Sequence, residues 1–392
     1  MQVAESETAA PDSRVWSAVG SLAMCVAMLI SSEFMPVSLL TPIADDLGAT
    51  QGMAGQAISV SGLFAVVTSL FISVIAGRLD RRYVLMGLTA LMLGSLVLIA
   101  LAPSFIVLML ARALLGIAIG GFWALSTATV MRLVPEDVVP KALGIIFTGN
   151  AIATAFAAPI GSYLGGAIGW RGVFWGLVPL VLVNIAWQWI SLPSMPPQAS
   201  KTIGQLFALL KRRNVACGMV AVMLTFAGAF CTFTYLRPFL ETYTQVGVTE
   251  LSLFLLGLGL AGFIGTYAST ALVNLRLYPL LRYLPLLLAA CTVAMLMLGH
   301  LKWGVALMMI CWGGLNAAIP VAWSTWLSRS VADDPESGGG LLVAAIQLSI
   351  MLGASLGGFL LDHGSIAMTF IGGALLMVLG ALMVGNGSRL RA

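Results

Sequence analysis

Twelve stretches of this chain are apolar enough and long enough to cross a lipid bilayer as helices. A spanning helix needs about 20 mainly apolar residues, because the hydrocarbon core offers no partner for an unpaired backbone group. Hydrophobic residues make up 60% of the chain and charged residues only 9%. We therefore expect an all-α membrane protein with twelve transmembrane helices, centred near residues 28, 65, 94, 116, 154, 181, 226, 262, 292, 314, 350 and 375.

The basic residues between these stretches are distributed unevenly. Most of the 19 Lys and Arg residues fall on the side of the N-terminus, whereas the opposite side holds only Arg171, Arg237 and Lys302. Because Lys and Arg stay on the cytoplasmic side of a membrane, both termini are expected to be cytoplasmic. The same asymmetry accounts for the net charge of +4, so no nucleic-acid partner is expected.

The five cysteines lie singly within apolar stretches and show no CxxC spacing. This pattern favours neither a disulfide framework nor a metal site. No metal and no cofactor is expected. An enzyme is not expected either, because no nucleophile, base and acid fall together at one depth of the bilayer.

The longest polar interval follows the sixth helix and contains a run of prolines and an amphipathic stretch, 203–213. It is expected to lie on the cytoplasmic surface and to separate two sets of six helices. The predicted organisation is a disordered tail at 1–15, an N-terminal bundle at 16–191, a linker at 192–214, a C-terminal bundle at 215–385 and a second tail at 386–392.

The two sets of six helices resemble each other. Arg132 and Val134 recur as Arg329 and Val331, about half the chain later, as a duplication predicts. Duplicated transport bundles place their binding site between the repeats, near the middle of the membrane, and work by rocking one half against the other. The sequence therefore predicts two pseudo-symmetric bundles with a central site.

Glu33 and Arg112 fall well inside apolar stretches. A charge near the membrane centre costs about 2.5 to 3.5 kcal/mol on insertion scales, so it normally faces a bundle interior or a water-filled path. At 1.5 Å per residue the two lie about 10 and 12 Å below the same surface, and we expect them to meet. The positions half a chain later are Phe230 and Met309, so charge coupling belongs to the first half.

Burial favours the neutral form of Glu33, whereas a neighbouring guanidinium favours the ionised form. A carboxyl balanced between these effects can change protonation during transport, while Arg112 stays charged and exchanges partners. The alternative is a static ion pair that holds two helices together. Such a pair is often no more stable than apolar packing, which favours the proton-coupling hypothesis.

The fifth helix carries small residues at close spacing. Gly161 and Gly165, four residues apart, would let another helix approach closely. Pro159 removes one hydrogen bond from the helix ladder behind it. Close helix packing is the simplest interpretation, and it is compatible with a sliding contact during transport.

Three segments together resemble signature motifs of the major facilitator superfamily, in its twelve-helix drug:proton antiporter branch: 77–82, 108–116 and 158–166. The first lacks an Ala and a Gly of the family's loop motif. The resemblance implies the major facilitator fold and a cytoplasmic gate at Asp80, Arg81 and Arg82, with the acid capping the start of the eleventh helix. It also implies a role for Arg112 in proton transfer.

Further segments resemble the bacterial purine ribonucleoside exporters of that branch: 33–42, 120–124, 131–135, 140–143 and 323–326. This resemblance implies export of inosine-like or guanosine-like nucleosides, driven by protons flowing inward, by a monomer in the bacterial inner membrane. The expected partners are the small-molecule substrate, protons and the lipid bilayer. Sugar-efflux relatives share the acid at Glu33, so a multidrug or sugar efflux antiporter remains the alternative, and a non-transporting sensor the remote one.

A nucleoside is flat and neutral, so its site needs an aromatic wall and a few amides. Helical spacing places aromatic or amide side chains on stripes of the helices that line the cavity in this superfamily. Stacking of the base on Trp312 or Phe230 is expected, with hydrogen bonds from the amides. The predicted substrate-binding residues are Trp123, Asn150, Phe230, Trp312, Asn316 and Gln347.

Overall fold

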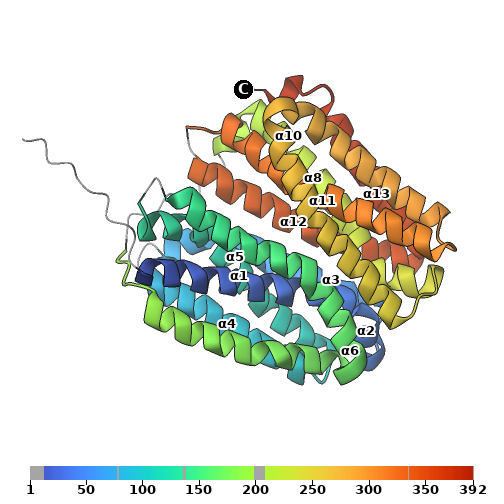
Figure 1. Ribbon diagram of the computed structural model, residues 1–392, viewed down its shortest axis with the longest axis horizontal. Coiled ribbons are helices and arrows are strands. Elements are labelled where there is room, and N and C mark those ends of the chain that lie inside the picture. Colours follow the sequence, from blue (N-terminus) through green and yellow to red (C-terminus); the bar gives the residue numbers. More distant parts are fainter. Residues whose placement is uncertain (1–12, 77–78, 136–137, 198–207, 334, 392) are drawn as a thin grey trace, which may run out of the picture.

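The computed structural model describes residues 13–76, 79–135, 138–197, 208–333 and 335–391 (Figure 1). Within these residues every regular element is helical. The first half contains α1 (Ser13–Ser38), α2 (Leu40–Leu47), α3 (Gln51–Ala76), α4 (Arg81–Leu101), α5 (Phe105–Leu133) and α6 (Val139–Ser191). The second half contains η1 (Leu209–Lys211), α8 (Arg213–Phe233), α9 (Leu236–Pro238), η2 (Phe239–Tyr243), α10 (Val248–Met297), α11 (Lys302–Ser330), α12 (Pro335–His363), α13 (Ile366–Val384) and η3 (Ser388–Leu390).

The described helices supply twelve spans, as expected. Eleven are long and apolar enough to cross a membrane, and one of these, Lys141–Ser191, holds 51 residues. It contains two spans, because α6 turns back at Gly169, whose φ of 74° is readily adopted only by glycine (Figure 1). The helix α10 also contains two spans, which are separated at Arg276, where φ is −141° and ψ is 50°.

The two halves form separate bundles that lie side by side, blue to green and yellow to red in Figure 1. Each has its own hydrophobic core, and they touch mainly where α3 packs on α12 and α6 on α10. The described chain begins and ends at the same end of the bundles, near Ser13 and Leu390, which we call the termini side. The opposite end is the far side.

Close backbone contacts repeat between the bundles. A Cβ added to Gly116 of α5 would lie 2.2 Å from the carbonyl oxygen of Ser61 on α3. In the second bundle a Cβ on Gly313 of α11 would lie 2.1 Å from the carbonyl oxygen of Leu258 on α10. Both members of the pair shift by the same number of residues, which agrees with a duplicated bundle.

Some parts of the predicted organisation lie outside the described residues. They are residues 1–12 of the first tail, 77–78 of the loop motif, 198–207 of the linker, which include the start of the amphipathic stretch, and 392 of the second tail. The helix α1 begins at Ser13, inside the predicted tail. The linker ends in the single turn η1 before α8 begins at Arg213.

Replacing Gly116 by valine should destabilise the protein, because the added side chain meets backbone that cannot move aside. Overpacking of this kind costs about 1 to 3 kcal/mol. The change is measured as a lower Tm of the purified protein in detergent. Gly94→Val on α4 is the matched control, because a Cβ there has nothing within 4 Å. Equal Tm values for the two variants would contradict the close contact.

Candidate functional site

The structure brings Glu33 and Arg112 together inside the first bundle. Glu33 is 2% exposed and Arg112 is fully buried. One terminal nitrogen of Arg112, Nη1, donates to the backbone oxygen of Ser32 at 2.8 Å, and Nη2 donates to the backbone oxygen of Glu33 at 3.4 Å. The prediction from helix depth that the two residues lie next to each other therefore agrees with the structure.

A proline explains why Arg112 binds this part of α1. Pro36 has no N–H, so the carbonyl of Ser32, four residues earlier, lacks its usual helical donor. A buried carbonyl without a donor is costly, and the guanidinium of Arg112 supplies one. The local sequence of α1 thus prepares the position that Arg112 occupies.

Arg112 also joins α5 to α3. Its Nε donates to the backbone oxygen of Ala57 at 2.9 Å, and its Nη2 donates to the hydroxyl of Ser61 at 2.9 Å. All four hydrogen bonds of the guanidinium go to backbone carbonyls or to a hydroxyl. A buried cation held in this way connects three helices, and the described contacts do not include a carboxylate oxygen.

The carboxyl of Glu33 has no hydrogen-bond or ion-pair partner in the part of the chain that the structure describes. Its Oε1 atom is buried and has no hydrogen-bond partner, and no ion pair joins it to Arg112 among the described residues. An ionised carboxylate left without a partner in a dry site is strongly unfavourable, whereas a protonated carboxyl tolerates burial far better. The guanidinium is nevertheless close, so this carboxyl can hold a proton beside a fixed positive charge.

An aromatic cluster lies across the interface from this pair. Phe34, the neighbour of Glu33 in α1, lies with its ring centroid 5.9 Å from that of Phe230 and 5.8 Å from that of Phe233 on α8. Phe233 in turn stacks on Trp312 of α11, with centroids 6.0 Å apart. We call Phe230, Phe233 and Trp312 the aromatic wall of the second bundle. The charged pair of the first bundle adjoins this wall through Phe34.

Trp312 holds the second layer of this wall. It is fully buried, its indole N–H donates to the hydroxyl of Thr292 at 3.1 Å, and Phe233 covers one ring face. In this structure Phe230 and Phe233, rather than Trp312, are the aromatic faces of the second bundle that lie against α1. Stacking of a base on Trp312 stays a prediction.

The other predicted substrate contacts come from α5, α6, α11 and α12. Trp123 stacks on Phe147, with centroids 5.9 Å apart, within the first bundle. Asn150 and Asn316 are half-buried, on α6 and α11. Gln347 is 5% exposed on α12, and its Oε1 has no hydrogen-bond partner among the described residues.

The predicted fifth-helix motif packs within and between bundles. Gly161 and Gly165 of α6 lie against Ser38 and Leu39 at the end of α1. Pro159 withholds a donor from the carbonyl of the residue four positions earlier, Ala155. A Cβ added to Gly259 of α10 would lie 2.3 Å from that same oxygen, so the two bundles cross closely there.

The predicted gate residues contact their own bundle. Asp80 caps α4 by accepting from the backbone N–H of Arg82 at 2.8 Å, and it also accepts from the N–H of Met195 at 3.0 Å and from the hydroxyl of Ser194. Burial acts to raise the pKa of Asp80, but these hydrogen bonds outweigh it and hold the pKa below its usual range. The backbone N–H of Arg81 donates to the oxygen of Met195.

These contacts differ from the one that the family resemblance implies. The described hydrogen bonds of Asp80 cap α4. The cap that Asp80 was expected to provide at the eleventh span, α12, stays a prediction, because the start of that span adjoins residue 334, which lies outside the described residues. Arg82 likewise reaches Trp189 at the end of α6, with its guanidinium over the indole ring at 5.2 Å. The described contacts of Asp80 and Arg82 therefore fasten the termini side of the first bundle to itself.

Sequence reasoning missed a polar contact between the bundles on the far side. Arg237 of α9 donates to Oε1 of Glu241 at 2.7 Å and to the backbone oxygen of Ser38. The other carboxylate oxygen of Glu241 accepts from the hydroxyl of Thr41 at 2.6 Å. We call Ser38, Thr41, Arg237 and Glu241 the far-side latch. The spacing of Arg237 and Glu241 indicates an ion pair, but nothing local indicates its partners on the other bundle.

A second far-side contact joins α3 to α12. Asp362 accepts from the hydroxyl of Thr50 at 2.6 Å and from the backbone N–H of Gly52 at 3.0 Å. Between described residues, every hydrogen bond that links the two bundles lies in the far half of the molecule. The bundles are closed against each other on the far side.

Comparison with known proteins agrees with this architecture. Residues 21–338 match the family model of the Major Facilitator Superfamily. The chain is 50% identical, over 372 residues, to the transcription regulatory protein OpdE of Pseudomonas aeruginosa. The aligned residues cover 94% of this chain and 92% of OpdE.

It is also 44% identical to the purine ribonucleoside efflux pumps NepI of Salmonella enteritidis and Salmonella typhimurium, over 94% of this chain and 93% of each pump. The similarity extends along nearly the whole chain in each case, and the twelve spans form the two bundles expected of such a protein. The chain belongs to the Major Facilitator Superfamily.

Proposed function

We propose that this protein is a proton-coupled antiporter that exports purine ribonucleosides of the inosine or guanosine type by alternating access. The observation that carries the proposal is the buried, unpaired carboxyl of Glu33 beside Arg112. It lies next to an aromatic wall, in a chain similar to purine ribonucleoside efflux pumps.

The far-side-closed structure suits a protonated Glu33. Its carboxyl lacks a partner, and an uncompensated buried charge costs several kcal/mol. When the proton leaves toward the termini side, the carboxylate of Glu33 attracts Arg112. Arg112 then releases a carbonyl of α1 and donates a hydrogen bond to this carboxylate instead. Because Arg112 also bonds to α3, this exchange changes how α1 packs on α3.

The substrate site that we propose adjoins this pair. Phe34 and Phe230 offer aromatic faces for a purine base, and Phe233, which packs on both rings and on Trp312, supports the wall. Gln347 has a buried amide oxygen without a partner, which suits an N–H or O–H donor of a nucleoside. Asn150 and Asn316 are the remaining amide candidates.

Opening toward the far side requires the far-side latch to break. Its carboxylate, Glu241, faces the side that we propose to be periplasmic, because the termini side carries most of the basic residues. With a neutral substrate and one proton, each cycle moves one charge. That charge gains about 2.3 kcal/mol per 100 mV of membrane potential.

A regulatory role is the second candidate, because the relative that is 50% identical is named a transcription regulatory protein. A sensor would also bind a ligand between the bundles, but it would not move the ligand uphill. A transport assay therefore distinguishes the two. Efflux of drugs or sugars is the alternative within transport.

Replacing Glu33 by glutamine should abolish uphill transport. In inverted membrane vesicles energised with a proton gradient, accumulation of labelled inosine should fall about tenfold or more, because the proton's 2.3 kcal/mol per 100 mV is no longer coupled. Exchange of inosine across the membrane should persist. Glu250→Gln is the matched control, since Glu250 pairs with Lys302 on the exposed surface. Unchanged accumulation in E33Q would refute proton coupling through this residue.

Competition identifies the substrate class. Uptake of labelled inosine into the same vesicles should be inhibited by unlabelled guanosine but by neither arabinose nor a cationic dye. The proposed site is an aromatic wall with amides, and the carboxylate of Glu33, when ionised, is attracted to Arg112 rather than left free for a cation. Inhibition by the dye alone would favour a multidrug exporter. No gradient-driven uptake of any of these compounds would favour the regulatory role.

Removing the far-side latch should open the far side more often. Glu241→Ala deletes the acceptor of both Arg237 and Thr41. A cysteine placed at Ser59, buried between α3 and α12, should then react several-fold faster with an impermeant maleimide in right-side-out vesicles. The background has the five native cysteines replaced by alanine. Glu250→Ala serves as the control, and equal reaction rates in the two variants would count against a latch.

A further inference from the structure

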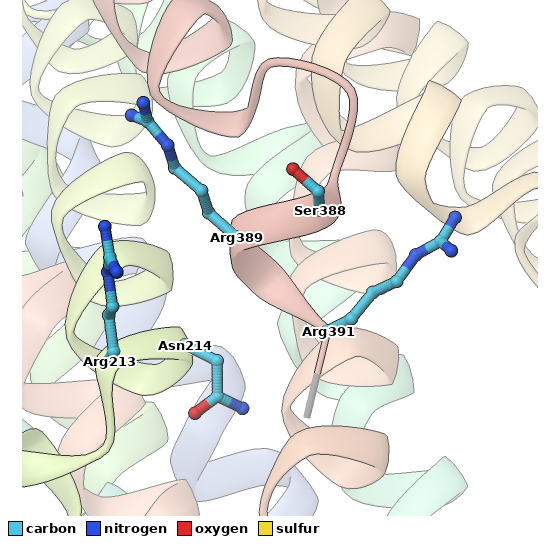
Figure 2. Close-up of a pocket in the computed structure, with 5 residues that line it drawn as sticks. All are labelled: Arg213, Asn214, Ser388, Arg389 and Arg391. Carbon is cyan, nitrogen blue, oxygen red and sulfur yellow. The ribbon is translucent and has the colours of Figure 1, made fainter.

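A basic cavity opens on the termini side of the second bundle, away from the site between the bundles (Figure 2). Its volume is about 380 Å³. It lies between the first turn of α8 and the C-terminal turn η3, and it is lined by Arg213, Asn214, Ser388, Arg389 and Arg391. In Figure 2 Arg389 extends from η3 on the side of Arg213, whereas Arg391 leaves η3 on the opposite side.

The turn that carries two of these arginines is fastened to the bundle. The indole N–H of Trp326 donates to the backbone oxygen of Leu390 at 3.0 Å, and the side chain of Leu390 is fully buried. Gly387 has a φ of 81°, and a Cβ there would lie 2.7 Å from Tyr278. The arginines of η3 are therefore held on a docked segment rather than on a loose end.

Among the described residues, the arginines that line the cavity have no carboxylate partner. Arg212, just before α8, has a partner: it donates two hydrogen bonds to Asp333, at 2.8 and 2.6 Å, which hold the pKa of that carboxyl at about 2. No described carboxylate lines the cavity, and none of the described residues forms an ion pair with Arg213 or Arg389. Two guanidiniums beside one cavity repel each other unless an anion lies between them.

The cavity offers more than charge to an anion. The helix α8 begins at Arg213 with no side-chain cap on its first backbone N–H groups, where a negative charge is favoured by the helix dipole. The amide of Asn214 and the hydroxyl of Ser388 also line the space and can donate hydrogen bonds. Paired guanidiniums with several neutral donors suit a phosphate group.

The surroundings of the cavity suit a lipid. It lies where two membrane-spanning helices begin and end, and those helices expose apolar side chains just beyond it. Leu382, in the last turn of α13, is 64% exposed, Leu379 one turn earlier is 50% exposed, and Val220 of α8 is 43% exposed. We propose that this cavity binds the phosphate of an anionic phospholipid headgroup between Arg213 and Arg389, with the acyl chains lying along α8 and α13.

The test measures lipid binding by the full chain, without a transport assay. Phosphatidylglycerol added to the protein in neutral detergent should raise its Tm, whereas phosphatidylcholine and inorganic phosphate at the same concentrations should not. In Arg213→Gln/Arg389→Gln the apparent affinity for phosphatidylglycerol should fall about tenfold or more, because two charge-assisted hydrogen-bonding groups are lost. Native mass spectrometry of retained lipid gives a second readout that does not depend on the variant's own stability.

Arg282→Gln is the matched control. Arg282 is also basic and on the termini side, but it lies over the ring of Tyr283 and does not line the cavity. It should bind phosphatidylglycerol like the unmodified chain. Equal retention of this lipid by the double variant, or no retention by the unmodified chain, would overturn the proposal. A full Tm shift with inorganic phosphate alone would show a site for free anions and would overturn the lipid assignment.

Discussion

One carbonyl group of α1 sets the position of the charge on which the first bundle depends. Pro36 cannot donate to Ser32, and the buried guanidinium of Arg112 takes the place of the missing N–H. The same guanidinium donates hydrogen bonds to Ala57 and Ser61 of α3, so the packing of α1 on α3 depends on this cation. A carboxylate can take the place of the carbonyl groups that accept its hydrogen bonds. The carboxyl of Glu33 lies beside it, unpaired. In the mechanism that we propose, protonation of Glu33 and helix packing are linked through the single side chain of Arg112.

This linkage lies next to the contact between the bundles. Phe34 follows Glu33 directly, and its ring packs on the phenylalanines of α8. A shift of α1 therefore changes a packing contact with the second bundle. The tip of the first bundle continues into that core, because Val37 and Leu40 pack with the hydrophobic residues of the second bundle. The far-side latch, with Arg237 and Glu241, closes the same region. Packing and polar contacts thus act at one end of the interface.

Hydropathy and helix geometry predict much of this arrangement and fail where distant partners decide it. The twelve spans follow from apolar length, and the depths of Glu33 and Arg112 follow from the fixed rise of a helix. The hydrogen-bond acceptor of Arg112 on α1 does not follow from helix rise, because it is a carbonyl that lacks its helical donor as a result of Pro36. The carboxylate of Asp80 accepts hydrogen bonds from α4 and from the segment after α6. No sequence motif specifies these contacts. Periodicity alone does not distinguish a ring that packs from a ring that faces substrate, because both have the same spacing, and in this structure Trp312 stacks on Phe233.

The most direct test of the account is proton movement driven by substrate alone. Inverted vesicles with no initial gradient are mixed with inosine, and the pH of the weakly buffered medium is followed. Inosine entering the lumen by antiport must drive protons out, so the medium should acidify, and the Glu33→Gln protein should give no such signal. Acidification of equal size with E33Q, or inosine entry without any change of pH, would contradict the coupling of transport to this carboxyl.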